Sequence, residues 1–116
     1  MKPAAWLSAI GALLAAAGVA GSAWASHGVA DPQDAQRLQL AALFGFGHGV
    51  ALAALAPQVR GRLGVLAACL LLMGTCLFSG SLAAHALADM STRLAPAGGM
   101  ALIAGWLLWA LHALRR

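Results

Sequence analysis

The feature that most constrains this chain is the spacing of its few charged side chains. They leave four runs free of Asp, Glu, Lys and Arg, at 3–30, 38–59, 63–88 and 94–114. A helix needs about 20 mostly apolar residues to cross a hydrocarbon core of about 30 Å, and every run is long enough. The runs lack the apolar/polar alternation of barrel strands. The sequence therefore predicts four transmembrane helices.

The composition supports a membrane protein. Of the 116 residues, 62% are hydrophobic and 9% are charged, whereas about a quarter of an ordinary soluble domain is charged. This composition argues against a disordered chain, a disulfide scaffold or a monomeric soluble domain. The formal net charge is +4, but the seven Lys and Arg residues are divided among several expected membrane edges. We therefore expect no nucleic-acid partner.

Helix-start and helix-stop signals divide the chain at the same places as the charges. Asp31-Pro32 is typical of an N-cap followed by proline in the first turn, and Pro57 and Gly61 separate the second and third runs. The fold class we predict is all-α and integral to the membrane, a four-transmembrane-helix antiparallel bundle in one domain, 1–116. The expected spans are 4–26, 33–56, 62–88 and 96–114.

The basic residues predict the orientation. If both termini are cytoplasmic, that side holds five of the seven Lys and Arg residues, and the other side holds two basic residues and all three acids. Lys and Arg collect on the cytoplasmic side of membrane proteins. We therefore expect both termini in the cytoplasm, a multi-pass location in a bacterial inner (plasma) membrane, and anionic lipids as partners at the inner face. A homo-oligomer or a membrane-protein partner is also compatible with the sequence.

The first run has an alternative interpretation. Lys2, an apolar stretch and Ala23-Trp24-Ala25 before Ser26 are similar to a signal peptide with its cleavage site. Cleavage there would leave three spans and place the new N-terminus outside.

Several short motifs, taken together, resemble one small membrane family. The matching segments follow one another along the chain: Ser26-His27-Gly28, His48, Phe78–Leu82, Pro96–Gly99 and Gly105-Trp106. In this order they are similar to the pattern of domain-of-unknown-function family 423, which includes bacterial YgdD-type proteins and animal transmembrane protein 256. Phe-Ser-Gly-Ser-Leu combined with Pro-x-Gly-Gly is the specific part of the pattern.

The resemblance implies a small integral inner-membrane protein and supplies no activity. The chain departs from the family pattern at two positions. Phe44 stands where the family tends to carry tyrosine, and Ala95 stands where it has threonine. A role that needs those hydroxyl groups is therefore in doubt for this chain.

His48 is the first candidate for a functional side chain. It lies about ten residues into the second run, near the expected bilayer midplane, where an ionisable residue is costly and often functional. The simpler interpretation is a neutral imidazole that is hydrogen-bonded to a neighbouring helix. Gly45 and Gly49 form a Gly-x-x-x-Gly motif that permits close helix approach and fits either interpretation.

A second group of candidates gathers at the expected outer side. We predict that His27, Ser79, Ser81, Gly98 and Gly99 line a ligand-binding site there, with His48 beneath them. Backbone N–H groups at the start of the fourth helix could face an anion or a carbonyl. The alternative is that these small and hydroxyl residues pack helices together. No catalytic residue and no cofactor is predicted, and a metal is left open.

One stripe of sulfur-containing side chains, Cys69, Met73 and Cys76, suits Cu(I) by chemistry. The sequence favours a packing role for it, since no paired Cys or Met motif accompanies it.

Two functions are compatible with these patterns. The first is a non-enzymatic membrane protein that acts through lipid or partner-protein contacts, because no set of residues typical of an active site is present. The second is a ligand- or metal-handling membrane protein, either an accessory binder or a small oligomeric transporter, that uses His48 and the outer polar cluster.

Overall fold

The computed structural model describes residues 2–116 and consists of helices joined by short connections. The four long helices are α1 (Pro3–His27), α2 (Pro32–Leu55), α3 (Gly61–Ala88) and α4 (Ala95–Arg115), and a short 3-10 turn η1 (Ala56–Gln58) follows α2. Each of their bounds lies within one residue of the span expected from the sequence. All four are long and apolar enough to cross a membrane.

The helix ends follow local rules. At the start of α2, a carboxylate oxygen of Asp31 accepts a hydrogen bond from the backbone N–H of Asp34 over 3.0 Å, which caps the helix. Gly61 begins α3 with a φ of +64°, a conformation that favours glycine. α3 ends at Asp89, which holds a left-handed φ of +53° although it is not glycine.

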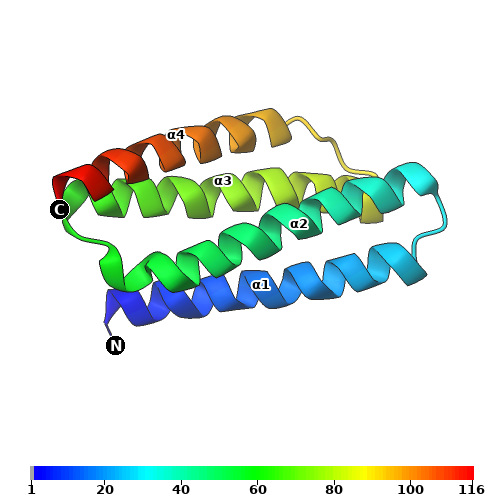
Figure 1. The fold of residues 1–116 in the computed structure, drawn as a ribbon. Helices are drawn as coiled ribbons and strands as arrows, with labels where there is room; N and C mark the ends of the chain where they lie inside the picture. Colours follow the sequence, from blue (N-terminus) through cyan, green and yellow to red (C-terminus); the bar gives the residue numbers. More distant parts are fainter. Residues whose placement is uncertain (1) are drawn as a thin grey trace.

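The helices pack in chain order. α1 packs against α2, α2 against α3, and α3 against α4, and sequential helices run in opposite directions (Figure 1). α1 and α4 are not among the closely packed pairs, so the four antiparallel helices form a bundle that is open between α1 and α4. Both ends of the chain lie at the same end of the molecule (Figure 1).

Glycines allow the closest helix contacts. A Cβ atom added at Gly49 of α2 would lie 2.6 Å from the backbone nitrogen of Ala15 in α1. A Cβ at Gly74 of α3 would lie 2.9 Å from the carbonyl oxygen of Gly98 in α4. Each of these pairs of helices therefore meets backbone to backbone, as small residues permit in membrane proteins.

The outer surface of the molecule is apolar. Leu13 is 70% exposed, Leu107 67% and Leu114 85%, whereas the small core is built on Leu52, Leu71 and Leu102. A soluble monomer rarely exposes apolar patches larger than a few hundred Å². Surfaces of this kind on four long helices are what a hydrocarbon surrounding requires.

Candidate functional site

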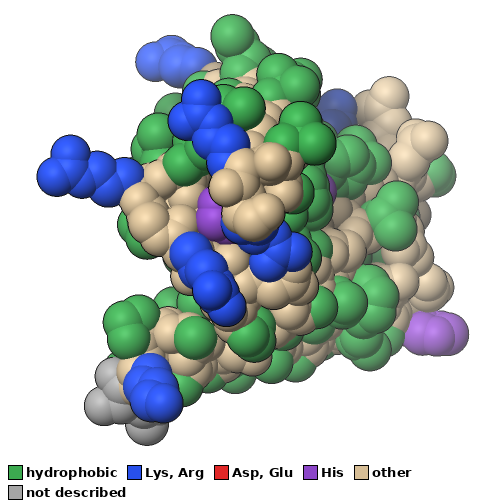
Figure 2. Space-filling view, turned by 60° about the vertical axis from the view of Figure 1, so that its left-hand side comes forward, with side chains coloured by type: hydrophobic (Ala, Val, Ile, Leu, Met, Phe, Trp, Pro, Cys, Tyr) green, Lys and Arg blue, Asp and Glu red, His purple; other side chains and the backbone are tan. Residues whose placement is uncertain are grey.

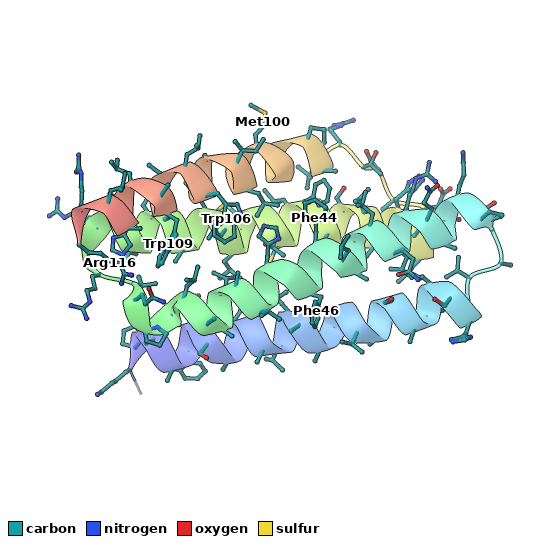
Figure 3. The ribbon with its side chains drawn as sticks, in the orientation of Figure 1. Phe44, Phe46, Met100, Trp106, Trp109 and Arg116 are labelled. Atoms are coloured by element: carbon teal, nitrogen blue, oxygen red, sulfur yellow. The ribbon has the colours of Figure 1, made fainter. Side chains whose placement is uncertain are left out.

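His48 lies between two helices and is hydrogen-bonded at both ring nitrogens. Its Nδ1 lies 2.9 Å from the carbonyl oxygen of Phe44, one turn earlier in α2. Its Nε2 lies 3.0 Å from the indole nitrogen of Trp106 in α4. α2 and α4 are not closely packed neighbours, so these two side chains provide a bridge between them past α3. Figure 3 shows Trp106 directed from α4 towards α2.

The two partners determine the form of the imidazole. A carbonyl oxygen can only accept a hydrogen bond, and an indole N–H can only donate one. His48 therefore donates from Nδ1 to Phe44 and accepts at Nε2 from Trp106. This is the neutral Nδ1–H tautomer, because a second ring proton would face the indole N–H. In this arrangement neither ring nitrogen is available to coordinate a metal.

Aromatic rings surround the histidine. The Phe44 ring stacks on His48 with centroids 5.7 Å apart, and it also contacts Phe78 of α3 with centroids 4.6 Å apart. A shallow groove of about 340 Å³ opens beside His48 and is lined also by Leu43, Phe44, Gly47 and Trp106. The surroundings of His48 are thus aromatic, with the two hydrogen bonds as their polar part.

Ser81 hydrogen-bonds the connection between α3 and α4. Its hydroxyl, on a residue that is 9% exposed, donates to the carbonyl oxygen of Ser91 over 3.3 Å. One turn later, His85 donates from Nδ1 to the carbonyl oxygen of Met90 over 2.7 Å. Both side chains hold the segment 89–94 against the end of α3.

The hydroxyl of Ser79, unlike that of Ser81, is not hydrogen-bonded in the part of the chain that the structure describes. Its hydroxyl oxygen is buried and has no hydrogen-bond partner within residues 2–116. A Cβ added at Gly45 of α2 would lie 3.8 Å from this oxygen, so the hydroxyl sits where α3 faces α2. A buried unpaired hydroxyl costs free energy and calls for an explanation.

Gly98 and Gly99 differ in their surroundings although they are adjacent. Gly98 is buried at the closest contact of α4 with α3, and its N–H donates to the carbonyl oxygen of Leu94. A Cβ on Gly99 would meet only the Phe78 ring, at 3.8 Å. At the start of α4 the N–H of Ala95 is bonded to Thr92 and Pro96 has none, which leaves few donors for an anion.

His27 lies apart from this group. It is the last residue of α1, is exposed, and makes no side-chain hydrogen bond to the part of the chain that the structure describes. The structure therefore places the six predicted residues in several environments: His48 at the α2–α4 bridge, Ser79 and Gly98 at helix contacts, and Ser81 in α3 with its hydroxyl bonded to the α3–α4 connection. That they bind a ligand stays a prediction.

Sequence reasoning missed a polar contact between α1 and α2. The side-chain amide of Gln39 accepts from the Ser22 hydroxyl over 2.8 Å and donates to the Ser26 hydroxyl over 2.9 Å. Gln39 lies inside a charge-free run, as do Ser22 and Ser26 in the run before it. An amide and two hydroxyl groups within neighbouring expected spans were the sequence signal for a hydrogen-bonded contact between the helices.

A second missed cluster lies at the end that holds both termini. The ring of His112, which is 5% exposed, donates from Nε2 to the carbonyl oxygen of Gln58 over 3.0 Å. Arg116 donates to the side-chain oxygen of the same Gln58 over 2.6 Å. The ring packs over Gly64, where a Cβ would lie 2.9 Å from it. No local sequence signal marks this cluster, because Gln58 and Arg116 are 58 residues apart in the chain.

The arrangement of possible metal-ligating side chains gives no support to metal binding. Across residues 2–116, no group of three or more His, Cys, Asp or Glu side chains is placed to hold an ion. Cys69, Met73 and Cys76 are all exposed along α3, so the packing role expected for that stripe is wrong for this arrangement of helices.

Four antiparallel helices that are long and apolar enough to cross a membrane, with polar side chains paired across helices, define a small multi-pass membrane protein. Comparison with models of protein families shows which family the chain belongs to. The model of the DUF423 family, described as a protein of unknown function, matches residues 21–99, and the chain belongs to this family. Comparisons with curated proteins and with solved structures found no match.

Proposed function

We propose that this protein is non-enzymatic and acts through the contacts that its helices make with lipids or with other membrane proteins. The observation that carries the proposal is the pairing of His48. Its two ring nitrogens are engaged by Phe44 and Trp106, so this histidine in the middle of α2 serves to join α2 to α4. Binding at the outer surface of the helices is the activity that we propose for the chain.

The proposal includes a location and an orientation. We place the chain in a bacterial inner membrane with both termini in the cytoplasm. The basic end of the molecule supports this, since five of the seven Lys and Arg residues lie in the segments at that end. A reporter enzyme that works only in the cytoplasm should be active when it is fused after Arg116. If a reporter that works only outside the cytoplasm is active at the same position, the proposed orientation is wrong and the termini lie outside.

His48→Gln tests the proposed role of the histidine. The variant should unfold more easily in detergent, by about 1 kcal/mol, because an intramembrane hydrogen-bonded pair is disturbed. The native mass of the purified subunit, lipids aside, should differ between the two proteins only by the mass of the substituted side chain. A non-lipid molecule or ion that is retained by the parent protein and lost in His48→Gln would overturn the proposal.

Ser79 favours a second candidate, a ligand-binding membrane protein. Its buried hydroxyl without a partner is the kind of group that a ligand or an ordered water would satisfy. Ser79→Ala separates the two functions. With no ligand there, removing the orphan hydroxyl should leave stability equal or raise it by up to about 1 kcal/mol. A bound molecule that is present in the parent protein and absent from Ser79→Ala would favour the ligand-binding function.

A further inference from the structure

The end of the molecule that carries both termini has a basic pocket. It occupies about 260 Å³ and is lined by Arg60, Gly61, Arg62, His112, Arg115 and Arg116. Figure 2 shows Lys and Arg side chains gathered over this end, with no acidic side chain visible on the face shown. Since one water takes up about 30 Å³ in the liquid, the volume is enough for a phosphate group with several waters.

The arginines of this pocket have no acidic partners. Within residues 2–116 the one ion pair joins Arg37 to Asp34, at the opposite end of the molecule. All three acidic side chains belong to the segments at that opposite end. Four guanidinium groups around one pocket therefore face no carboxylate side chain. Guanidinium groups bind phosphate in a two-pronged geometry, which makes such a set well suited to that anion.

The backbone adds to the same charge. α3 begins at Gly61, and no side chain caps its first turn. The left-handed Gly61 leads the chain from Arg60 into the helix, and the first residues of α3, Gly61 and Arg62, line the pocket. Helix N-termini with free N–H groups favour anions.

The floor of the pocket is fixed in place. His112 is 5% exposed and bonded to the carbonyl oxygen of Gln58, and Arg116 is bonded to the side chain of the same residue. These contacts tie the end of α4 to η1 and hold the two arginine-bearing segments, 60–62 and 115–116, around one space. In Figure 3 Arg116 lies at this end of α4, beside the start of α3.

We propose that this pocket binds a phosphate group, and that its source is the head group of an anionic phospholipid at the membrane surface. The inference deepens the proposed function, on which it rests, because it names a ligand class for the contacts with the bilayer. Basic pockets between helices at the cytoplasmic face are a known way of binding such head groups.

The test uses the purified full-length protein in a mild detergent, with phosphatidylglycerol and phosphatidylcholine as probes and native mass as the readout. The parent protein should retain phosphatidylglycerol in preference to phosphatidylcholine. Arg62→Gln combined with Arg115→Gln should bind phosphatidylglycerol at least tenfold more weakly, since each lost charge-assisted contact is worth about one factor of ten. Both side chains are exposed, so the variant should fold normally.

Lys2→Gln is the matched control. It removes one positive charge from the same end of the molecule but does not line the pocket. The matching comparison is the single variant Arg62→Gln, which also removes one charge. An equal loss of binding in Lys2→Gln and in this single variant would overturn the inference, because general attraction to a basic end would then explain the binding. Unchanged binding in the double arginine variant would overturn it as well.

Inorganic phosphate, titrated into the same samples, distinguishes the two sources of the group. If it binds only weakly and does not displace phosphatidylglycerol, the lipid is the source. If it binds by itself and displaces the lipid through the same arginines, the phosphate site stands and free phosphate is its ligand. Neither result depends on His48, so failure here and failure of the non-enzymatic proposal are separate outcomes.

Discussion

The indole N–H of Trp106 donates to Nε2 of His48 over 3.0 Å, although 58 residues separate the two in the chain. This hydrogen bond joins α4 to α2 in a region where the two helices are not closely packed. It also requires that the proton of the neutral imidazole sits on Nδ1, opposite the carbonyl oxygen of Phe44.

The first prediction concerns this pair. Nitrogen NMR of the protein in detergent should show His48 as the neutral Nδ1–H tautomer. Trp106→Phe keeps an aromatic ring but removes the donor, and should lower the free energy of unfolding by about 1 kcal/mol. Trp24→Phe is the control, because Trp24 is 54% exposed and its indole N–H makes no bond within the described residues. The Nε2–H tautomer, or equal effects of the two substitutions, would contradict the assigned bond.

The second prediction compares two glycines of α2. Gly49→Ala places a methyl group 2.6 Å from the Ala15 backbone and should cost about 1–3 kcal/mol through overpacking. Gly47→Ala meets nothing within 4 Å and should be neutral, or stabilising by up to about 1 kcal/mol through helix propensity. Unfolding in detergent measures both. Similar effects at the two positions would mean that α1 and α2 do not meet at Gly49.

The third prediction makes the same comparison at Gly98 and Gly99, which the sequence pattern places together in a ligand site. Gly98→Ala would bring a methyl group to 2.9 Å from the Gly74 carbonyl oxygen and should destabilise the protein by about 1–3 kcal/mol. Gly99→Ala has only the Phe78 ring nearby and should be tolerated. If instead Gly99→Ala fails to fold and Gly98→Ala folds normally, the contact between α3 and α4 is misassigned.

The fourth prediction concerns Asp89, whose φ of +53° is unusual for a residue with a Cβ. Asp89→Gly should raise the free energy of unfolding by up to about 1 kcal/mol, because glycine adopts this conformation without steric cost. Asp89→Ala should not share the gain. Thermal unfolding of the three proteins checks this, and a loss of stability in Asp89→Gly would show that the carboxylate itself contributes there.

The span limits could be predicted because charges, prolines and glycines mark them directly. The capping of α2 by Asp31 and the start of α3 at Gly61 are local events, and local signals determined them. The family relationship was equally readable, because its motifs lie in order along the chain and the family model covers 21–99.

The faces of the helices could not be predicted, because helices that are apolar on all sides carry no stripe that points to a neighbour. Gly45 and Gly49 look like one contact motif in the sequence. In the structure Gly45 faces Ser79 of α3, whereas Gly49 faces Ala15 of α1. The outward direction of Cys69, Met73 and Cys76 escaped prediction for the same reason.

The candidate site was predictable only in part. The charge-free run showed that His48 lies inside a span. It also allowed the simpler interpretation that the imidazole is hydrogen-bonded to a neighbouring helix. Its partner Trp106 was not identified, because helix rotation and tilt determine which side chains meet. The basic pocket depended on bringing 60–62 next to 115–116, which requires the packing of α3 on α4.

The pairing of helices also bears on how the protein is made. α1 packs along α2 and α3 along α4, while α2 meets α3 less extensively. The chain is thus two helical hairpins in sequence, and each can leave the translocation machinery as a pre-paired unit with its backbone contacts already formed. On this view biogenesis consists of two insertion events, and the docking of one hairpin on the other is the last step, the one that brings Trp106 of α4 to His48 of α2.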